Sequence, residues 1–313
     1  MSSEAVLSEQ TASVKKNRIG RNTLTEWAWG YAMILPLFIG LAAFYFYPAG
    51  RVIYDSLYEV GAFGRRSFVG LENYQSMIGD SAMWASLVNS LIYAAIIVPA
   101  TVILAMFLAG MLNAKIRGLS VFRVIYFIPA VTMTVAVSMM WRWIFNGDFG
   151  ILNQIIQFFG GAPIRWLGAR ATAMTSISIV SVWMGIGVNM VILLAAMQGV
   201  PAAYYEAATL DGASGPKKFF SITMPLIAPA ISFVSITTMI GTLQIFDVIF
   251  MLMPPRSSAL TSTQSVVMYF FRNAFEFSRR GYASAIAVLL LVIIMIFTVL
   301  QLKLQKKWVN YDS

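Results

Sequence analysis

The sequence predicts an all-α, polytopic membrane protein with about six transmembrane helices, and two observations carry this prediction. The 313 residues are 59% hydrophobic and only 11% charged, whereas an average soluble domain carries about 25% charged residues. The charges are distributed so that long charge-free runs separate them, which is typical of spanning helices and not of the short alternating segments of a β-barrel. A helix also satisfies its own backbone hydrogen bonds inside a bilayer.

Each charge-free run supplies roughly the 17–25 apolar residues that cross the hydrocarbon core. The runs are 27–50, 81–114, 124–141, 171–205, 219–246 and 281–302. We therefore expect an N-terminal tail at 1–26, a transmembrane domain at 27–308 and a C-terminal tail at 309–313.

The lysines predict the orientation of the chain in the membrane. An even number of spans places both ends on one side, and every lysine then falls in the N-terminal tail, in the loops 113–123 and 198–224, or after the last apolar run, at 303–307. Basic residues accumulate on the cytoplasmic side of membrane proteins. We expect an inner-membrane protein whose N- and C-termini are both cytoplasmic.

Composition argues against several functions. The chain has no Cys and no His, so it lacks thiol chemistry and the commonest metal ligand, and we predict no catalytic and no metal-binding residues. The net charge of +9 fits basic cytoplasmic flanks better than nucleic-acid binding. No G-x-x-x-x-G-K-[ST] phosphate-binding loop is present, so we expect no ATP site in this chain.

The loop around 198–225 predicts a helix–turn–helix at the membrane surface. Pro201 ends the fourth span, good helix formers fill 202–210, and Gly212 is a suitable stop. A second short helix is expected at about 215–223. Small side chains in the loop allow another surface to approach closely, and its two carboxylates can hold an Arg or a backbone amide. From the spacing alone, an ordinary connecting loop remains an equal alternative.

The same loop resembles the cytoplasmic "EAA" loop of the permease subunits of binding-protein-dependent ABC importers. That loop has the pattern E-A-A-x3-G-x9-I-x-L-P, and here Met224 replaces its Leu. The residues that match it, with the adjoining Asp-Gly-Ala, are Glu206, Ala207, Ala208, Asp211, Gly212, Ala213, Ile222 and Pro225. The resemblance implies that these residues couple the chain to a cytoplasmic ATPase.

Other segments resemble the carbohydrate-importing branch of this family, in particular the first permease subunit of maltose and glycerol-phosphate importers. These segments are 68–74, 122–129, 141–146, 149–153 and 281–285, and the resemblance covers about 28–308. It implies a type I ABC importer permease fold. It also implies a second permease subunit as a heterodimer partner, two cytoplasmic ATPase subunits that bind ATP and Mg, and an extracytoplasmic solute-binding protein.

A carbohydrate path needs aromatic, amide and hydroxyl side chains, which the fourth and fifth spans carry. Some of these positions also match residues that face sugar in maltose-type relatives. The candidate path residues are Ser181, Trp183, Met184, Gly185, Asn189, Thr238, Gly241, Gln244 and Asp247. The alternative for each polar residue is packing between helices, which Ser, Thr and Asn mediate in membranes. We hypothesise that Gln244 and Asp247 line the path.

Two other classes of function remain as alternatives. An ion-coupled secondary transporter requires ionisable residues or broken helices near the midplane, and the centres of the predicted spans contain no acidic residue. An intramembrane enzyme requires a nucleophile with a base, or a metal cluster. The sequence favours translocation of a carbohydrate or related polyol by an ABC-importer permease.

Overall fold

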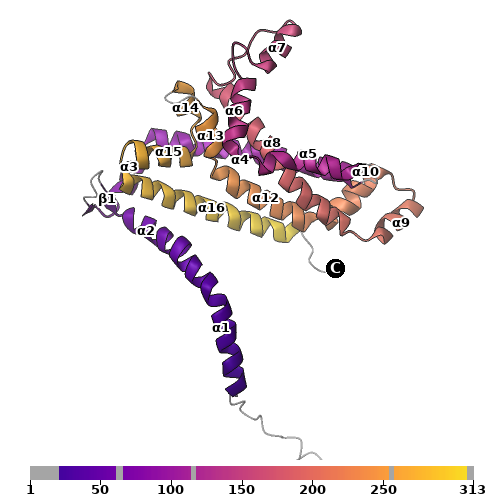
Figure 1. Cartoon of the computed structure of the whole chain (residues 1–313), viewed down its shortest axis with the longest axis horizontal. Helices are drawn as coiled ribbons and strands as arrows, with labels where there is room; N and C mark the ends of the chain where they lie inside the picture. The colour runs from indigo at the N-terminus through magenta and orange to yellow at the C-terminus, as the bar shows by residue number, and fades with distance from the viewer. Residues whose placement is uncertain (1–20, 61–65, 114–117, 254–256, 309–313) are drawn as a thin grey trace, which may run out of the picture. The chain divides into compact units, whose positions relative to one another are not determined.

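The computed structural model describes residues 21–60, 66–113, 118–253 and 257–308, and these are almost entirely helical (Figure 1). The one departure from the predicted all-α class is a small antiparallel hairpin of strands β1 (Tyr58–Val60) and β2 (Arg66–Phe68). The chain divides into two compact units, 1–52 and 53–313.

The described part of the first unit belongs to one long helical segment. Helix α1 (Arg21–Leu41) continues through a π-helical turn, η1 (Ala42–Phe46), into α2 (Tyr47–Asp55). Its stretch Thr25–Asp55 is long and apolar enough to cross a membrane, which agrees with the run expected at 27–50. Helix α1 begins at Arg21, within the predicted tail 1–26. Residues 1–20 and the predicted tail 309–313 lie outside the described residues.

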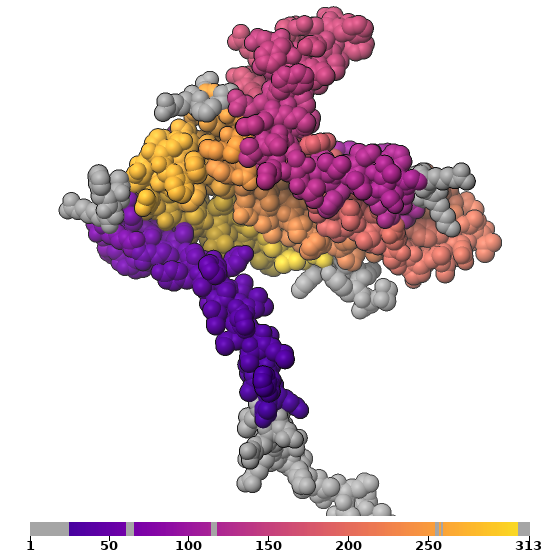
Figure 2. Space-filling view, in the orientation of Figure 1, coloured from indigo at the N-terminus to yellow at the C-terminus, as the bar shows by residue number. Residues whose placement is uncertain are grey.

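The second unit contains the remaining helices. They are α3 (Glu72–Ile78), α4 (Ser81–Leu112), α5 (Leu119–Val131), α6 (Thr134–Ile144), α7 (Ile151–Phe158), α8 (Arg170–Gln198), α9 (Ala202–Leu210), α10 (Gly215–Lys218), η2 (Phe219–Thr223), α11 (Met224–Leu226), α12 (Ala228–Leu243), α13 (Asp247–Leu252), α14 (Ser258–Thr263), α15 (Val266–Phe271), η3 (Arg272–Glu276) and α16 (Arg280–Trp308). In Figure 1, α9 and α10 lie at one end of this unit and α13, α14 and α15 lie towards the other. In the space-filling view, α7 and the segment after it project beyond the rest of the unit (Figure 2).

The described residues contain four helices that can each span a membrane, or six spans if each of two bent helix pairs counts as one. The expectation of about six spans is therefore consistent with the structure. The third and fifth runs are each bent in the structure.

The third run is broken by a bend of 97° between α5 and α6. Thr132 and Met133 adopt extended ψ angles of 140° and 127° at the break, one turn after Pro129, which has no amide hydrogen to donate. The fifth run bends by 70° between Gly215–Leu226 and Ala228–Leu243. Prolines 225 and 229 flank that break. The short helix expected at about 215–223 agrees with this second bend. The bend between α5 and α6 was not expected, because hydrophobicity does not distinguish a straight span from a broken one.

The core of the second unit is built around α4 and α8. Buried side chains of both helices share two hydrophobic clusters, and a third joins the start of α4 to α15 and α16. Helix α5 crosses α8 at Gly187, where a Cβ atom would overlap the carbonyl oxygen of Tyr126 and lie 3.1 Å from the Cα of Phe127. A small residue at this point permits the close approach of two helix backbones.

Candidate functional site

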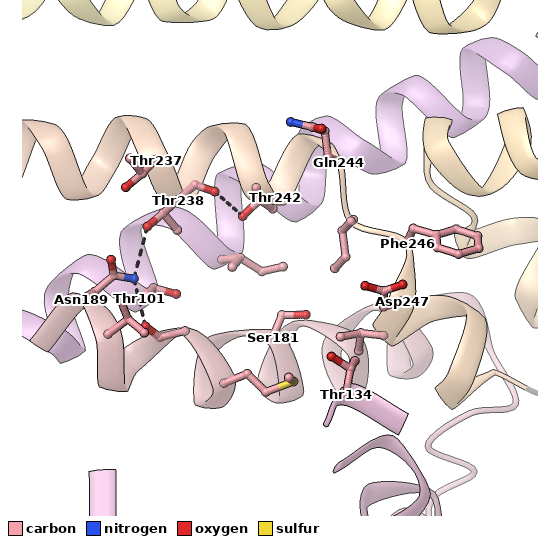
Figure 3. A pocket seen from close by; sticks show the side chains of 17 residues that line it. Thr101, Thr134, Ser181, Asn189, Thr237, Thr238, Thr242, Gln244, Phe246 and Asp247 are labelled. Atoms are coloured by element: carbon pink, nitrogen blue, oxygen red, sulfur yellow. Dashed lines mark hydrogen bonds between the residues drawn. The ribbon is translucent and has the colours of Figure 1, made fainter. Parts of the chain in front are cut away.

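A cavity of about 460 Å³ lies between α4, α8 and α12, and it extends to the start of α6 and α13 (Figure 3). Its lining comprises Ile97, Thr101, Thr134, Ser181, Met184, Gly185, Val188, Asn189, Thr237, Thr238, Gly241, Thr242, Gln244, Ile245, Phe246, Asp247 and Val248. Hydroxyl and amide groups dominate its polar lining, and Asp247 is the single ionisable residue among the described residues that line it. Such a surface suits an uncharged, polyhydroxylated solute.

One end of the cavity is organised by Asn189 of α8. Its amide nitrogen donates to the backbone oxygen of Gly185 at 2.9 Å and to the hydroxyl of Thr238 on α12 at 3.3 Å (Figure 3). Both amide hydrogens are thereby used, and this contact joins the two helices across the cavity. Thr101 of α4 lies beside this pair in Figure 3.

Thr101 has an unusual hydroxyl. Its side chain is 1% exposed, and its Oγ1 has no hydrogen-bond partner among the described residues. Leaving a buried polar group unpaired costs free energy, and such groups are rare in folded proteins. This hydroxyl is therefore an unpaired polar group at the end of the cavity where Asn189 lies.

The other end of the cavity is formed where the backbone leaves the helical path. Helix α12 ends at Leu243, and α13 begins at Asp247, so Gln244, Ile245 and Phe246 form a break between them. The Phe246 ring stacks on Phe250 with a centroid distance of 5.2 Å. Asp247 lies in the first turn of α13, and its carboxylate lies beside the cavity (Figure 3).

The structure brings most of the predicted path residues to this one cavity. Those on its lining are Ser181, Met184, Gly185, Asn189, Thr238, Gly241, Gln244 and Asp247. Trp183 is not part of the described lining, and its ring packs edge-on against Trp141 at 5.8 Å. Thr101 and Thr134 line the cavity but were not predicted. They come from the second and third runs, where a threonine in apolar sequence gives no signal that separates packing from binding.

The second candidate site is the loop that joins α8 to α12. Helix α9 spans Ala202–Leu210, as the sequence predicts, and Gly212 follows it with a φ of +71°. The amide of Gly212 donates to the oxygen of Thr209 at 3.1 Å, and the amide of Ala213 donates to the oxygen of Ala208 at 2.9 Å. This pair of bonds is a Schellman motif, which requires a left-handed residue at the position of Gly212.

The surface of α9 is open. Helix α9 contains no buried residue, and Leu210 at its end is 90% exposed. Two contacts tie it to the next segment, between the hydroxyls of Tyr205 and Thr223 at 2.8 Å and from Lys218 Nζ to Thr209 Oγ1 at 2.7 Å. The matching residues Glu206, Ala207, Asp211, Gly212 and Pro225 are exposed, whereas Ala208, Ala213 and Ile222 are half-buried.

The two sites are joined through the chain. Helix α8 lines the cavity and ends at Gln198, four residues before α9 begins. Helix α12, which lines the opposite side, begins directly after α10, η2 and α11. A displacement of α9 and α10 therefore acts on the ends of both helices that hold the cavity.

The chain is similar to a known transport family. Residues 101–310 match the family model of the binding-protein-dependent transport system inner membrane component. The chain is 33% identical over 287 residues to the probable ABC transporter permease protein YesP of Bacillus subtilis, covering 91% of this chain and 92% of that protein. It is 32% identical over 275 residues to the trehalose/maltose transport system permease protein MalF of Thermococcus litoralis, covering 88% and 92%.

Its fold is similar to that of a chain in a solved bacterial ABC transporter involved in the import of the acidic polysaccharide alginate. The TM-score is 0.82 at 19% sequence identity, and the match covers 94% of this chain and 100% of that chain. At this identity the likeness concerns the fold alone.

Proposed function

Because the chain belongs to the family of binding-protein-dependent transport system inner membrane components, we propose that it is the permease subunit of an ATP-driven importer that carries a carbohydrate or related polyol. The observation that supports this solute class most directly is the cavity, whose polar lining consists of hydroxyls, amides and, among the described residues, one ionisable group, Asp247. The name of the archaeal relative, a trehalose/maltose permease, points to the same class.

The proposed translocation path runs through this cavity. Hydroxyl and amide side chains replace the hydrogen bonds that a solute loses when it leaves water, so a polyol can enter without a large desolvation cost. Thr101, Asn189 and Thr238 would bind solute hydroxyls at one end, and Gln244 and Asp247 at the other. Phe246 offers an aromatic face at the same end, on which an apolar sugar face can pack.

The proposed coupling element is the loop α9–α10. It would dock into an ATPase subunit on the cytoplasmic side, with Leu210 and the small residues of α9 at the contact. Closure of two ATPases on ATP and Mg would move α9 as a rigid body, and α8 and α12 would transmit that movement to the cavity. ATP chemistry belongs to the ATPase subunits in this proposal.

The proposed assembly contains this chain, a second permease subunit, two ATPases and an extracytoplasmic solute-binding protein. The lysine distribution supports cytoplasmic positions for both termini and for α9–α10. An importer of this kind is multi-pass in the inner membrane, and its permease pair is a heterodimer.

Reconstitution tests the proposal. The chain, its partner permease, the ATPases and the binding protein are purified together in proteoliposomes, and uptake of labelled maltose, trehalose and lactose is measured with and without ATP. ATP-dependent uptake of at least one neutral sugar supports the function. Uptake that follows an ion gradient without ATP would establish the ion-coupled alternative instead.

A further inference from the structure

We propose that Ser265 is a positioning residue that fixes the break between α12 and α13, and with it one wall of the cavity. Ser265 lies between α14 and α15 and is fully buried. Its hydroxyl donates to the backbone oxygen of Ile245 at 2.6 Å and accepts from the amide of Met268 at 3.1 Å. One side chain thus holds the start of α15 and the centre of the break together.

The carbonyl of Ile245 needs such a partner because it lies in the break, after the last helical turn of α12 and before the first turn of α13. The amides of Gln244 and Ile245 donate back to Gly241 and Thr242, and the amide of Phe250 donates to the oxygen of Phe246. A buried carbonyl that lacks a partner is costly, so the bond to Ser265 stabilises this particular backbone path. The residues on either side of Ile245 line the cavity.

Ser265 is itself held in place by α4. A set of buried hydrogen bonds, which we call the polar clasp, joins α4 to the segment 262–266. Asn89 Nδ2 donates to the oxygens of Ser262 and Gln264 at 3.0 and 3.1 Å. The Tyr93 hydroxyl donates to the oxygen of Thr263 at 3.0 Å, and Ser90 Oγ accepts from the amide of Val266 at 2.9 Å.

The side chains of the polar clasp have hydrogen-bond partners. Arg170 of α8 donates to Asn89 Oδ1 at 2.9 Å, so both ends of that amide are used. Asn89, Ser90, Tyr93 and Ser265 are all buried. Fully satisfied buried networks select one arrangement of the elements they join. The polar clasp therefore ties α4, α8 and α15 to the break that carries Gln244, Phe246 and Asp247.

The role of this cavity wall in transport rests on the proposed function. The position of the wall does not, and the experiment reports on that position. The chain has no cysteine, so a single cysteine reports on one position. Thr242→Cys places a thiol on a buried part of the wall, where the wild-type residue is 6% exposed, and Ser214→Cys places one on the exposed loop before α10. The rate of modification by a charged methanethiosulfonate reagent is measured on the full chain in detergent.

Ser265→Ala should raise the modification rate of Thr242→Cys about five- to tenfold, the range expected for loss of one buried hydrogen bond, and leave the rate of Ser214→Cys unchanged. Ser262→Ala is the matched control, because among the described residues its hydroxyl bonds to the neighbouring Ala259 oxygen and not to the break, and it should change neither rate. Equal rates at Thr242→Cys in the two variants would overturn the proposal. A parallel rise at both reporters would also overturn it, because that result indicates general loosening.

Tyr93→Phe keeps the experiment decisive if Ser265→Ala does not fold. It removes the bond to Thr263 and keeps the buried ring, and it should raise the rate at Thr242→Cys about twofold. A wild-type rate in Tyr93→Phe would then count against the polar clasp. In the reconstituted importer, Ser265→Ala should raise the KM for uptake more than it lowers kcat. Failure of the wild-type importer to take up sugar would refute the proposed function and leave the labelling result standing.

Discussion

The phenol of Tyr269 in α15 donates a hydrogen bond of 2.6 Å to Oδ2 of Asp80, whose Oδ1 accepts from two amides at the start of α4. Tyr282 of α16 donates to the same Oδ2. One carboxylate therefore joins three helices. Burial and the bond to Asp80 raise the pKa of the Tyr269 hydroxyl, so it remains a protonated donor throughout the physiological range.

This arrangement predicts a dependence of stability on pH. Burial raises the pKa of Asp80, but the hydrogen bonds from Tyr269, Tyr282 and the amides of α4 outweigh it and hold the pKa below its usual value. A lowered pKa stabilises the fold above the unfolded value of about 3.9, and that contribution is lost as the pH falls through the folded pKa. The Tm of the wild type in detergent should therefore fall between about pH 5 and about pH 3 more steeply than that of Asp80→Asn.

The Asp80→Asn variant should also have the lower Tm at pH 7, since it lacks the charged acceptor. Asp148→Asn is the control, because it replaces an exposed carboxylate elsewhere in the chain by the same amide. Identical dependence of Tm on pH in the wild type and Asp80→Asn would contradict the lowered pKa of Asp80.

Gly212→Ala should weaken coupling to the ATPase. The φ of +71° costs a residue with a side chain about 1–2 kcal/mol, although no atom lies within 4 Å of the added Cβ. Helix α9 has no buried side chain to hold it in place, so its end should fray. ATPase activity stimulated by the loaded binding protein should fall several-fold. Gly215→Ala, in the same loop and without a positive φ, should retain it, and equal activities would argue against α9 as the coupling element.

Asp247→Asn tests the acidic end of the cavity. A carboxylate accepts hydrogen bonds from hydroxyls more strongly than an amide does, by about 1 kcal/mol. The KM for sugar uptake should rise about fivefold, with assembly of the importer unchanged. Asp148→Asn again serves as the control. Unchanged uptake by Asp247→Asn in an intact complex would remove Asp247 from the path.

Thr101→Val distinguishes a role in solute binding from a role in folding at the other end of the cavity. The hydroxyl of Thr101 has no partner among the described residues, so its replacement by a methyl group should leave the Tm unchanged or slightly higher. The KM for uptake should nevertheless rise about fivefold, by the loss of one hydrogen bond to the solute. Thr175→Val on the exposed side of α8 is the matched control. A lower Tm with an unchanged KM would make Thr101 a packing residue.

Gly187→Ala should destabilise the crossing of α5 and α8. The added Cβ would meet the backbone at Tyr126 and Phe127, which cannot move as a side chain can. Overpacking of this kind typically costs about 1–3 kcal/mol. The Tm measured by size-exclusion chromatography after heating should fall by several degrees, whereas Gly30→Ala, in open space, should not lower it. Equal Tm values would show that the two helices separate without cost.

Several features were predictable because they depend on residues close together in the chain. The end of α9 is one example: good helix formers at 202–210 and a glycine at 212 specify the helix and its Schellman motif locally. Helix α7 is another, because the apolar residues of Ile151–Phe158 lie at helical spacing and Gly160, with a φ of +80°, follows them. The apolar runs likewise indicated the number of spans, because crossing a bilayer requires a minimum length.

The sequence by itself determined the class of fold, the apolar runs long enough to cross a membrane and the helix–turn–helix loop, since these follow from composition and short-range pattern. Only the tertiary structure decided that α5 and α6 bend apart at Thr132, that Trp183 packs on Trp141 outside the cavity lining, and that Thr101 lines it. It also decided that Ser265 bonds to Ile245, twenty residues away. These outcomes depend on which side chains from distant segments meet, and a one-dimensional pattern of polarity does not specify that meeting.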